Sequence, residues 1–311
     1  MVGLALLGVG VGLLERGADW FADSATALAR RSGVPLAIVG LLTVGIEWEE
    51  LTVIVVALAE GAPRLAVGAL IGSAIANMTV VLSAGLLRRP LVPQRIDRTL
   101  GWIVLGATLL VASMAGSGRF GRREGVVLLV TFGAYALWLG RELRAGLRSA
   151  ALDLNDDDDD GDATASTSAL LWRLPAGLAL AIGGGELAVR GALRVSAGAG
   201  LSETVVGLTL VAIGASLPDI VISFVAARRG AAALVLANAA GSNVCNLLLL
   251  LGIVALFHPL SVPSTVLDVD VPVLLTVTAL FALTVRRNLI GRGYGAALLV
   301  VYGLYLLARL V

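Results

Sequence analysis

Four oxygen-bearing side chains lie within very apolar stretches of this chain, and they recur as two matching pairs. Glu50 and Asn77 form the first pair, and Asp219 and Asn246 form the second. The separation in sequence between carboxylate and amide is the same in both pairs. An ionisable side chain at the centre of a bilayer costs about 2.5 to 3.5 kcal/mol on insertion scales. Two carboxylates and two amides at matching depth therefore predict a cation site inside a membrane.

The oxygen atoms available near these pairs suit a hard cation. Ca²⁺ prefers about six to eight oxygen ligands at roughly 2.3 to 2.6 Å. Two carboxylates, two amide carbonyls and nearby hydroxyls supply part of that set. Gly45, Gly214 and Pro218 weaken or break a helix, so main-chain carbonyl oxygens become free to complete the set of ligands. Alternating access further requires that the same oxygens serve a competing cation or protons when the first ion is absent.

The elements that must hold these side chains are membrane-spanning helices. Hydrophobic residues make up 58% of the 311 residues, and the mean hydropathy of +0.94 exceeds what a soluble core needs. A spanning helix needs about 20 mainly apolar residues. Apolar runs of about this length centre near Gly8, Val44, Ile75, Gly106, Val130, Ala179, Ile213, Val244, Val277 and Val300. We expect an all-α membrane protein with about ten transmembrane helices.

A polar segment divides the ten runs into two sets of five. Residues 148–168 include DLNDDDDDGDATASTS, which is too charged and too poor in apolar groups to pack. We expect residues 1–147 and 169–311 to form two five-helix repeats joined by this acidic linker. Because five is odd, the second repeat enters the membrane from the opposite side, which predicts an inverted-topology repeat. The Asp run copies only the start of an EF-hand loop, since Thr167 stands where a bidentate Glu is needed.

The distribution of arginine predicts the orientation of the helices. All 23 basic residues are arginine. If the N-terminus lies outside, 16 of them fall in the inner connections and 7 on the outer side, which matches the excess of basic residues in cytoplasmic loops. We therefore expect both termini outside and the acidic linker in the cytoplasm. The setting we expect is a prokaryotic cell membrane.

The second repeat carries two motifs that identify a family. Asp219 ends the motif GASLPD, and Ser242 and Asn246 lie in the motif GSNVCN. These motifs resemble the second alpha-repeat of the cation/Ca²⁺ exchanger superfamily, in which a G-[TS]-S-x-P-E turn precedes G-S-N-x-x-N or G-S-N-x-x-D by one helix. Ser216 and Pro218 also match that turn. The resemblance covers both repeats and the ten-helix layout.

The resemblance implies a secondary-active antiporter with a ligand set drawn from both repeats. In the first repeat Gly45 and three potential ligands keep the family positions. The ligand candidates so implied are Glu50, Asp219, Asn77, Asn246, Ser73, Ser242 and Ser216. Two alternatives remain open from the residues alone. Ser73 and Ser242 can be ordinary helix hydroxyls that bond to the main chain, and the two carboxylates can form a buried structural pair.

The first repeat departs from the family at residues 46–49, where IEWE replaces hydroxyl-bearing residues and proline. Glu47 lies three positions before Glu50 and shares its helix face, whereas Glu49 points about 100° away. Many sodium/calcium exchangers have Asp where this chain has Asn246. Glu47 is therefore an eighth candidate ligand, because it restores a third carboxylate from the opposite repeat.

The function we expect is exchange of Ca²⁺, or a similar divalent cation, for Na⁺. An H⁺-coupled exchanger is the alternative, with Glu47 as the proton carrier, because clustered carboxylates repel and lose hydration, which favours protonation. A third possibility is an intramembrane Mg²⁺-dependent prenyl-transfer enzyme. It would need a second Asp-rich cluster on a helix face, which the sequence lacks. We therefore expect no enzyme and no cofactor; the expected partners are transported inorganic cations and the lipid bilayer, without nucleic acid.

Overall fold

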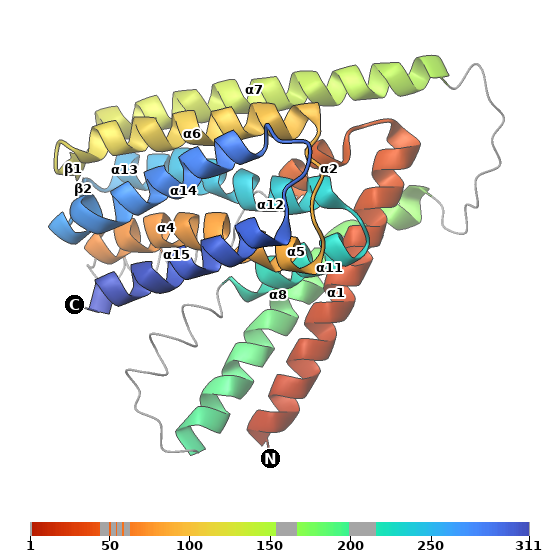
Figure 1. The fold of residues 1–311 in the computed structure, drawn as a ribbon, viewed down its shortest axis with the longest axis horizontal. Helices are drawn as coiled ribbons and strands as arrows, with labels where there is room; N and C mark the ends of the chain where they lie inside the picture. Colours follow the sequence, from red (N-terminus) through yellow and green to blue (C-terminus); the bar gives the residue numbers. More distant parts are fainter. Residues whose placement is uncertain are drawn as a thin grey trace.

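The computed structural model describes residues 2–43, 50, 54, 58, 63–153, 167–198 and 216–310, and these residues are mainly helical (Figure 1). The elements of the first half are α1 (Val2–Ser32), α2 (Leu36–Thr43), α4 (Pro63–Ala76), η1 (Asn77–Val81), α5 (Leu82–Arg88), α6 (Arg95–Ala115), β1 (Arg119–Phe120) and α7 (Arg122–Asp153). Those of the second half are α8 (Thr167–Gly198), α11 (Leu217–Arg228), α12 (Ala232–Val244), η3 (Cys245–Leu250), α13 (Leu251–Phe257), β2 (Leu260–Ser261), η4 (Val266–Asp270), α14 (Val271–Thr284) and α15 (Arg292–Leu310).

Two continuous helices form the centre of the molecule. Each consists of two α-helical segments joined by a π-helical turn: α4, η1 and α5 form one, and α12, η3 and α13 form the other. The most apolar stretch is 72% buried in the first of these helices and 78% buried in the second, whereas that of Arg122–Arg148 is 17% buried. The central pair therefore faces protein on most sides, whereas α7 faces the surroundings.

Among the described residues, five helices are long and apolar enough to cross a membrane, namely Ala66–Arg88, Arg95–Ala115, Arg122–Arg148, Ala232–Phe257 and Val266–Thr284. Three further predicted runs lie in α1, α8 and α15. The runs centred near Val44 and Ile213 fall largely outside the described residues. The prediction of an all-α membrane protein built from two repeats is confirmed.

Helices α1 and α8 pack against each other along a seam of glycines. A Cβ atom on Gly10 would lie 2.3 Å from the main-chain nitrogen of Ala188, and one on Gly17 would lie 2.4 Å from that of Ala181. On α8, Gly177 and Gly184 contact α1 in the same way. The glycines recur every seven residues. Residues nearer the start of α1 contact residues nearer the end of α8, so the two helices are antiparallel. In Figure 1 this pair extends away from the remaining helices.

Equivalent contacts recur in the two halves, which shows a twofold relation. Phe120 pairs with Leu260 in the two-residue sheet of β1 and β2, while the equivalent residues, Ile290 and Leu91, form an isolated antiparallel bridge. Equivalent positions of the two halves are 169 residues apart up to this point, as for Leu91 and Leu260, and 170 apart after it, as for Phe120 and Ile290. The separation grows by one because PLVP (90–93) corresponds to PLSVP (259–263), with a serine inserted.

The aromatic side chains repeat the same relation. Phe132 and Tyr135 on α7 have ring centroids 5.9 Å apart, and their equivalents on α15, Tyr302 and Tyr305, are 6.0 Å apart. Side chains as well as the backbone therefore follow the twofold relation.

Two contacts locate the axis of this relation. The side-chain amide of Asn243 donates a 3.0 Å hydrogen bond to the carbonyl oxygen of Ala74, which lies 169 residues earlier. The hydroxyls of Thr108 and Thr278, which are 170 residues apart, lie 3.5 Å from each other. A residue that meets its own equivalent must lie near a twofold axis. In Figure 1 the helix α4–α5 and the helix α12–α13 run in opposite directions, as an inverted repeat requires.

The connection between the halves is only partly described. Helix α7 continues to Asp153 and α8 begins at Thr167, so helical structure extends into the segment 148–168 from both ends. Residues 154–166, with the Asp run, lie outside the described residues. The predicted division at 147 and 169 stays a prediction.

Candidate functional site

Glu50 is a buried carboxylate with 8% of its surface exposed. The hydroxyl of Ser73 on α4 donates a 2.7 Å hydrogen bond to Glu50 Oε1. The amide of Asn246 on η3 in turn lies 3.5 Å from Ser73 Oγ, at the long limit of a hydrogen bond. The polar groups predicted from the two repeats are thus joined in one chain, Asn246 to Ser73 to Glu50. Ser73 is the link between the halves.

The two amides of the predicted ligand set lie at the start of π-helical turns. Asn77 is the first residue of η1, and Asn246 is the second residue of η3. Both residues are buried, with 1% and 0% of their surface exposed. A π turn widens the helix locally and is frequent at functional sites. Nothing in the apolar composition of these segments predicted it.

Asp219 lies in the first turn of α11, which begins at Leu217. Pro218 occupies the second position of that helix, where a missing N–H costs nothing. Ser216 precedes the helix as its N-cap residue, and its carbonyl accepts the N–H of Ile220 at 3.0 Å. Gly185 on α8 makes room for the proline, because a Cβ atom there would lie 2.9 Å from Pro218 Cγ. The carboxylate therefore stands at a helix N-terminus, and its residue is 9% exposed.

Asn238 supports the backbone of Asp219 and was missed by the sequence analysis. Its side-chain amide donates to the carbonyl oxygen of Asp219 at 3.2 Å and to Ser223 Oγ at 3.1 Å. Asn238 is 1% exposed, and it lies four residues before Ser242 on the same face of α12. The signal that could have found it is an Asn one turn before a motif residue inside an apolar run. Asn243, the axis residue, was likewise passed over although it belongs to the GSN motif.

The two equivalent serines are in different environments. Ser73 is engaged by Glu50 and Asn246, whereas Ser242, 1% exposed, has a hydroxyl without a hydrogen-bond partner among the described residues. Ser216 is 7% exposed, and its side chain makes no capping hydrogen bond to α11. These two hydroxyls are buried oxygens that a cation can use.

The structure brings the two halves of the predicted set into one region. Helix α11, with Asp219, packs against η1, with Asn77, and α4, with Ser73, packs against η3, with Asn246. No three His, Cys, Asp or Glu side chains converge within the described ranges. The candidate site is instead composed of two carboxylates with amide and hydroxyl oxygens. Glu47 and its neighbours 44–49 lie outside the described residues, so its role stays a prediction.

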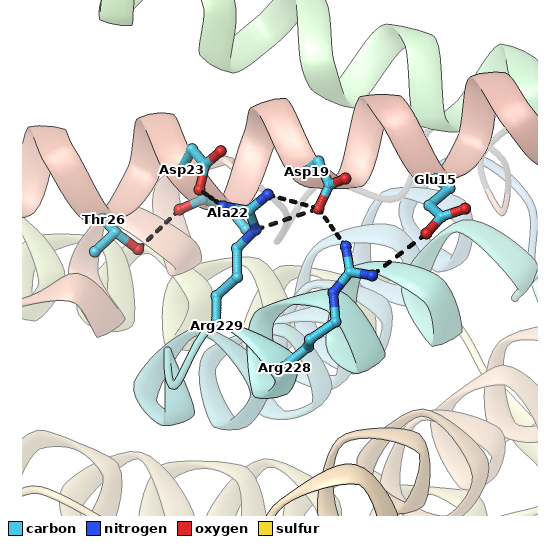
Figure 2. A network of polar contacts seen from close by, with 7 residues as sticks. All are labelled: Glu15, Asp19, Ala22, Asp23, Thr26, Arg228 and Arg229. Carbon is cyan, nitrogen blue, oxygen red and sulfur yellow. Dashed lines mark hydrogen bonds and ion pairs between the residues drawn. The ribbon is translucent and has the colours of Figure 1, made fainter. Parts of the chain in front are cut away.

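Ion pairs connect α11 to α1 at the far end from Asp219. Arg228 contacts Glu15 at 3.4 Å and Asp19 at 2.8 Å. Arg229 contacts Asp19 at 2.8 Å and also pairs with Asp23. Figure 2 shows the two guanidinium groups between the three carboxylates, which lie along one face of α1. The helix that holds Asp219 is therefore attached to the α1–α8 pair by charge.

A comparison with protein families matches nearly the whole chain. The family described as sodium/calcium exchanger protein matches residues 2–140 and again 169–311. The uncharacterized membrane protein MJ0091 of Methanocaldococcus jannaschii is 29% identical over 306 residues, covering 97% of this chain and 96% of the relative. The putative antiporter CaxA of Alkalimonas amylolytica is 30% identical over 292 residues, covering 91% and 90%. The sodium/calcium exchanger MaX1 of Methanosarcina acetivorans is 38% identical over 108 residues, which is 34% of this chain and 31% of the relative.

The fold is shared with a solved transporter. The sodium-calcium exchanger NCX_Mj, soaked with zero Na⁺ and Ca²⁺, superposes with a TM-score of 0.83 at 28% identity, covering 99% of each chain. Crystals of the same protein soaked with 10 mM Na⁺ and 10 mM Sr²⁺ give a TM-score of 0.81 at 28% identity, covering 100% of this chain and 98% of that one.

Proposed function

The chain belongs to the sodium/calcium exchanger family, and on that premise we propose that it exchanges Ca²⁺, or a similar divalent cation, for Na⁺. Members of this family are transporters and not enzymes, and they need no cofactor, since the cations are cargo. The prenyl-transfer enzyme considered from the sequence is thereby excluded. The protein is an integral membrane protein.

The proposed exchange takes place by alternating access at one midplane site formed by Glu50, Asp219, Asn77 and Asn246, with Ser73, Ser242 and Ser216 as further ligands. The observation that carries this proposal is the chain of polar contacts from Asn246 through Ser73 to Glu50. It joins a side chain of the second repeat to a carboxylate of the first. A site shared between the halves is what a rocking motion of one half against the other can expose to either membrane side.

The chemistry of the site favours a divalent cation that competes with Na⁺. Both are hard cations that prefer oxygen, and the buried groups offer carboxylate, amide and hydroxyl oxygens at once. Two buried carboxylates are costly without compensating positive charge. The site therefore prefers to be occupied by cations, and release of one ion is linked to binding of the other.

The same proposal includes the arrangement in the membrane. Residues 1–147 and 169–311 form the two repeats, residues 148–168 form a cytoplasmic linker, and both termini lie outside. The excess of arginine on one side supports this orientation.

Ion flux in reconstituted vesicles tests the proposal. Uptake of radioactive Ca²⁺ is measured with an outward Na⁺ gradient and, separately, with a pH gradient and no Na⁺. We expect the Na⁺ gradient to drive uptake and the pH gradient alone to fail; the reverse outcome would identify an H⁺-coupled exchanger.

Two substitutions locate the site. Glu50→Gln and Asp219→Asn remove a charge at nearly constant volume, so uptake is expected to fall by orders of magnitude. Asp97→Asn on α6 is the matched control, since Asp97 is also buried, at 1% exposure, but caps its own helix by accepting the N–H of Gln94 at 2.7 Å. Unchanged flux in either site variant would place the site elsewhere.

A further inference from the structure

A pocket lies between three helices at the end of the central helix α4–α5. Its volume is about 340 Å³, and its walls come from α5, α11 and α15. The residues around it are Ala84, Leu87, Arg88, Phe224 and Arg292. Arg88 is the last residue of the apolar helix Ala66–Arg88, and Arg292 is the first residue of α15. The pocket is therefore at the level where helices leave the membrane.

Within the part of the chain that the structure describes, no carboxylate neutralises the positive charge of this pocket. Among the described residues, neither Arg88 nor Arg292 forms an ion pair with a carboxylate. The neighbouring arginines at the end of α11 differ, because Arg228 and Arg229 are matched by three carboxylates of α1 (Figure 2). Two arginines at a membrane surface thus keep most of their donors for an external anion.

The two guanidinium groups are held at the rim of the pocket. One Nη of Arg292 donates to the main-chain carbonyl oxygen of Arg88 at 3.2 Å, which keeps the two residues adjacent. The Arg88 guanidinium carbon lies 5.9 Å from the centre of the Phe224 ring, a cation–π distance. Each guanidinium has five N–H donors, so these contacts leave several free for an oxyanion.

The rest of the pocket is apolar and open to the surroundings. Leu87 and Phe224 are 40% and 43% exposed. A free phosphate ion gains nothing from exposed leucine and phenylalanine. A phospholipid does, because its phosphate meets the arginines while its glycerol and first methylene groups cover the apolar side chains.

The twofold relation provides an internal comparison at the opposite end of the molecule. The position equivalent to Arg292 is Arg122, and the position equivalent to Arg88 is Phe257, which is 68% exposed. The equivalent place therefore has one arginine where this pocket has two. At these two equivalent positions, both residues are arginine at one end of the molecule only.

We propose that Arg88 and Arg292 bind the headgroup phosphate of an anionic phospholipid in one leaflet, with Leu87 and Phe224 covering its glycerol region. The bound lipid bridges α5, α11 and α15. Two of these helices continue to site residues, since α5 follows Asn77 and Ser73 in one continuous helix and α11 begins beside Asp219. The proposal does not depend on which cation is transported.

The test is a lipid titration of the purified full-length protein in detergent. The probes are dioctanoyl phosphatidylglycerol and dioctanoyl phosphatidylcholine, and binding is counted by native mass spectrometry. One basic residue near an anionic surface contributes about 1 kcal/mol, which is roughly fivefold in affinity. Arg88→Gln and Arg292→Gln should each weaken phosphatidylglycerol binding about fivefold, and the double variant about 25-fold. Arg122→Gln, at the equivalent position, should leave it unchanged.

Three outcomes would overturn the proposal. Equal affinity for the two lipids would mean that headgroup charge is not recognised. An equal loss in Arg122→Gln would mean diffuse attraction to any basic residue. Displacement of the lipid by millimolar inorganic phosphate would identify a phosphate site. If the double variant does not fold, Arg88→Lys with Arg292→Lys keeps the charge but loses the bidentate geometry, and its binding should fall between wild type and the single glutamine variants.

Discussion

The equivalent pair Ser73 and Ser242 yields the sharpest prediction, because the two serines make different contacts. Ser73→Ala removes the 2.7 Å hydrogen bond to Glu50 Oε1. A hydrogen bond to a charged group contributes about 1.5 to 3 kcal/mol. The 3.5 Å contact with Asn246 adds little. Ser242→Ala removes a hydroxyl without a hydrogen-bond partner among the described residues, so no such loss is expected.

The assay is thermal unfolding in detergent, followed by tryptophan fluorescence, with and without Ca²⁺. At about 2 °C per kcal/mol for a chain of this size, Ser73→Ala should lower the ion-free midpoint by roughly 3 to 6 °C. Ser242→Ala should leave the ion-free midpoint unchanged or raise it slightly, because an unsatisfied buried polar group is removed. Both variants should reduce the increase in midpoint that Ca²⁺ produces, since each loses an oxygen ligand.

This reasoning would be refuted if Ser242→Ala lowered the ion-free midpoint as much as Ser73→Ala did. It would also fail if Ser73→Ala left the ion-free unfolding midpoint unchanged. A wild-type response to Ca²⁺ in Ser242→Ala would remove that hydroxyl from the proposed ligand set.

Two further predictions concern the glycine seam between α1 and α8 and the acidic residues before Glu50. Gly10→Ala should destabilise the protein by about 1 to 3 kcal/mol, because its Cβ atom would lie 2.3 Å from a main-chain nitrogen of α8. The control is Gly12→Ala on the same helix, where nothing lies within 4 Å of the Cβ position. In the same unfolding assay this control should be neutral or mildly stabilising. If Glu47 carries a proton in the ion-free site, acid should inhibit divalent binding and Glu47→Gln should reduce that inhibition. If Glu47→Gln instead weakens divalent affinity and leaves the pH midpoint of binding unchanged, Glu47 is a fixed ligand. If neither quantity changes, Glu47 lies outside the site.

The sequence predicted the repeat well, and it singled out the candidate site for a definite physical reason. Polar residues are rare in spanning helices, so the equal spacing of Glu50 to Asn77 and Asp219 to Asn246 is visible against an apolar background. The family that the motifs suggested is confirmed. Their assignment as ligands stays a prediction.

Other features were not predictable from residue type. The π turns η1 and η3 have the same apolar composition as the α-helical segments around them, so hydropathy cannot distinguish the two. The continuation of α7 to Asp153 was also missed, because charge content marks where a segment is exposed but not where its helix ends. Asn238 escaped notice because it belongs to neither motif, although it supports the backbone of Asp219.

The unequal contacts of the two serines also label the conformation of the molecule. On the proposed alternating access, the two halves of the inverted repeat exchange their conformations, and each contact would be replaced by its equivalent. The Thr108–Thr278 contact would map onto itself and persist. The bond from Ser73 to Glu50 would instead be exchanged for one from Ser242 to Asp219, and the contact of Asn246 with Ser73 for one of Asn77 with Ser242. Because aspartate is one methylene shorter than glutamate, the two bonds would differ in geometry, and on the proposed mechanism the chain itself gives the inward-open and outward-open states different energies before any ion binds.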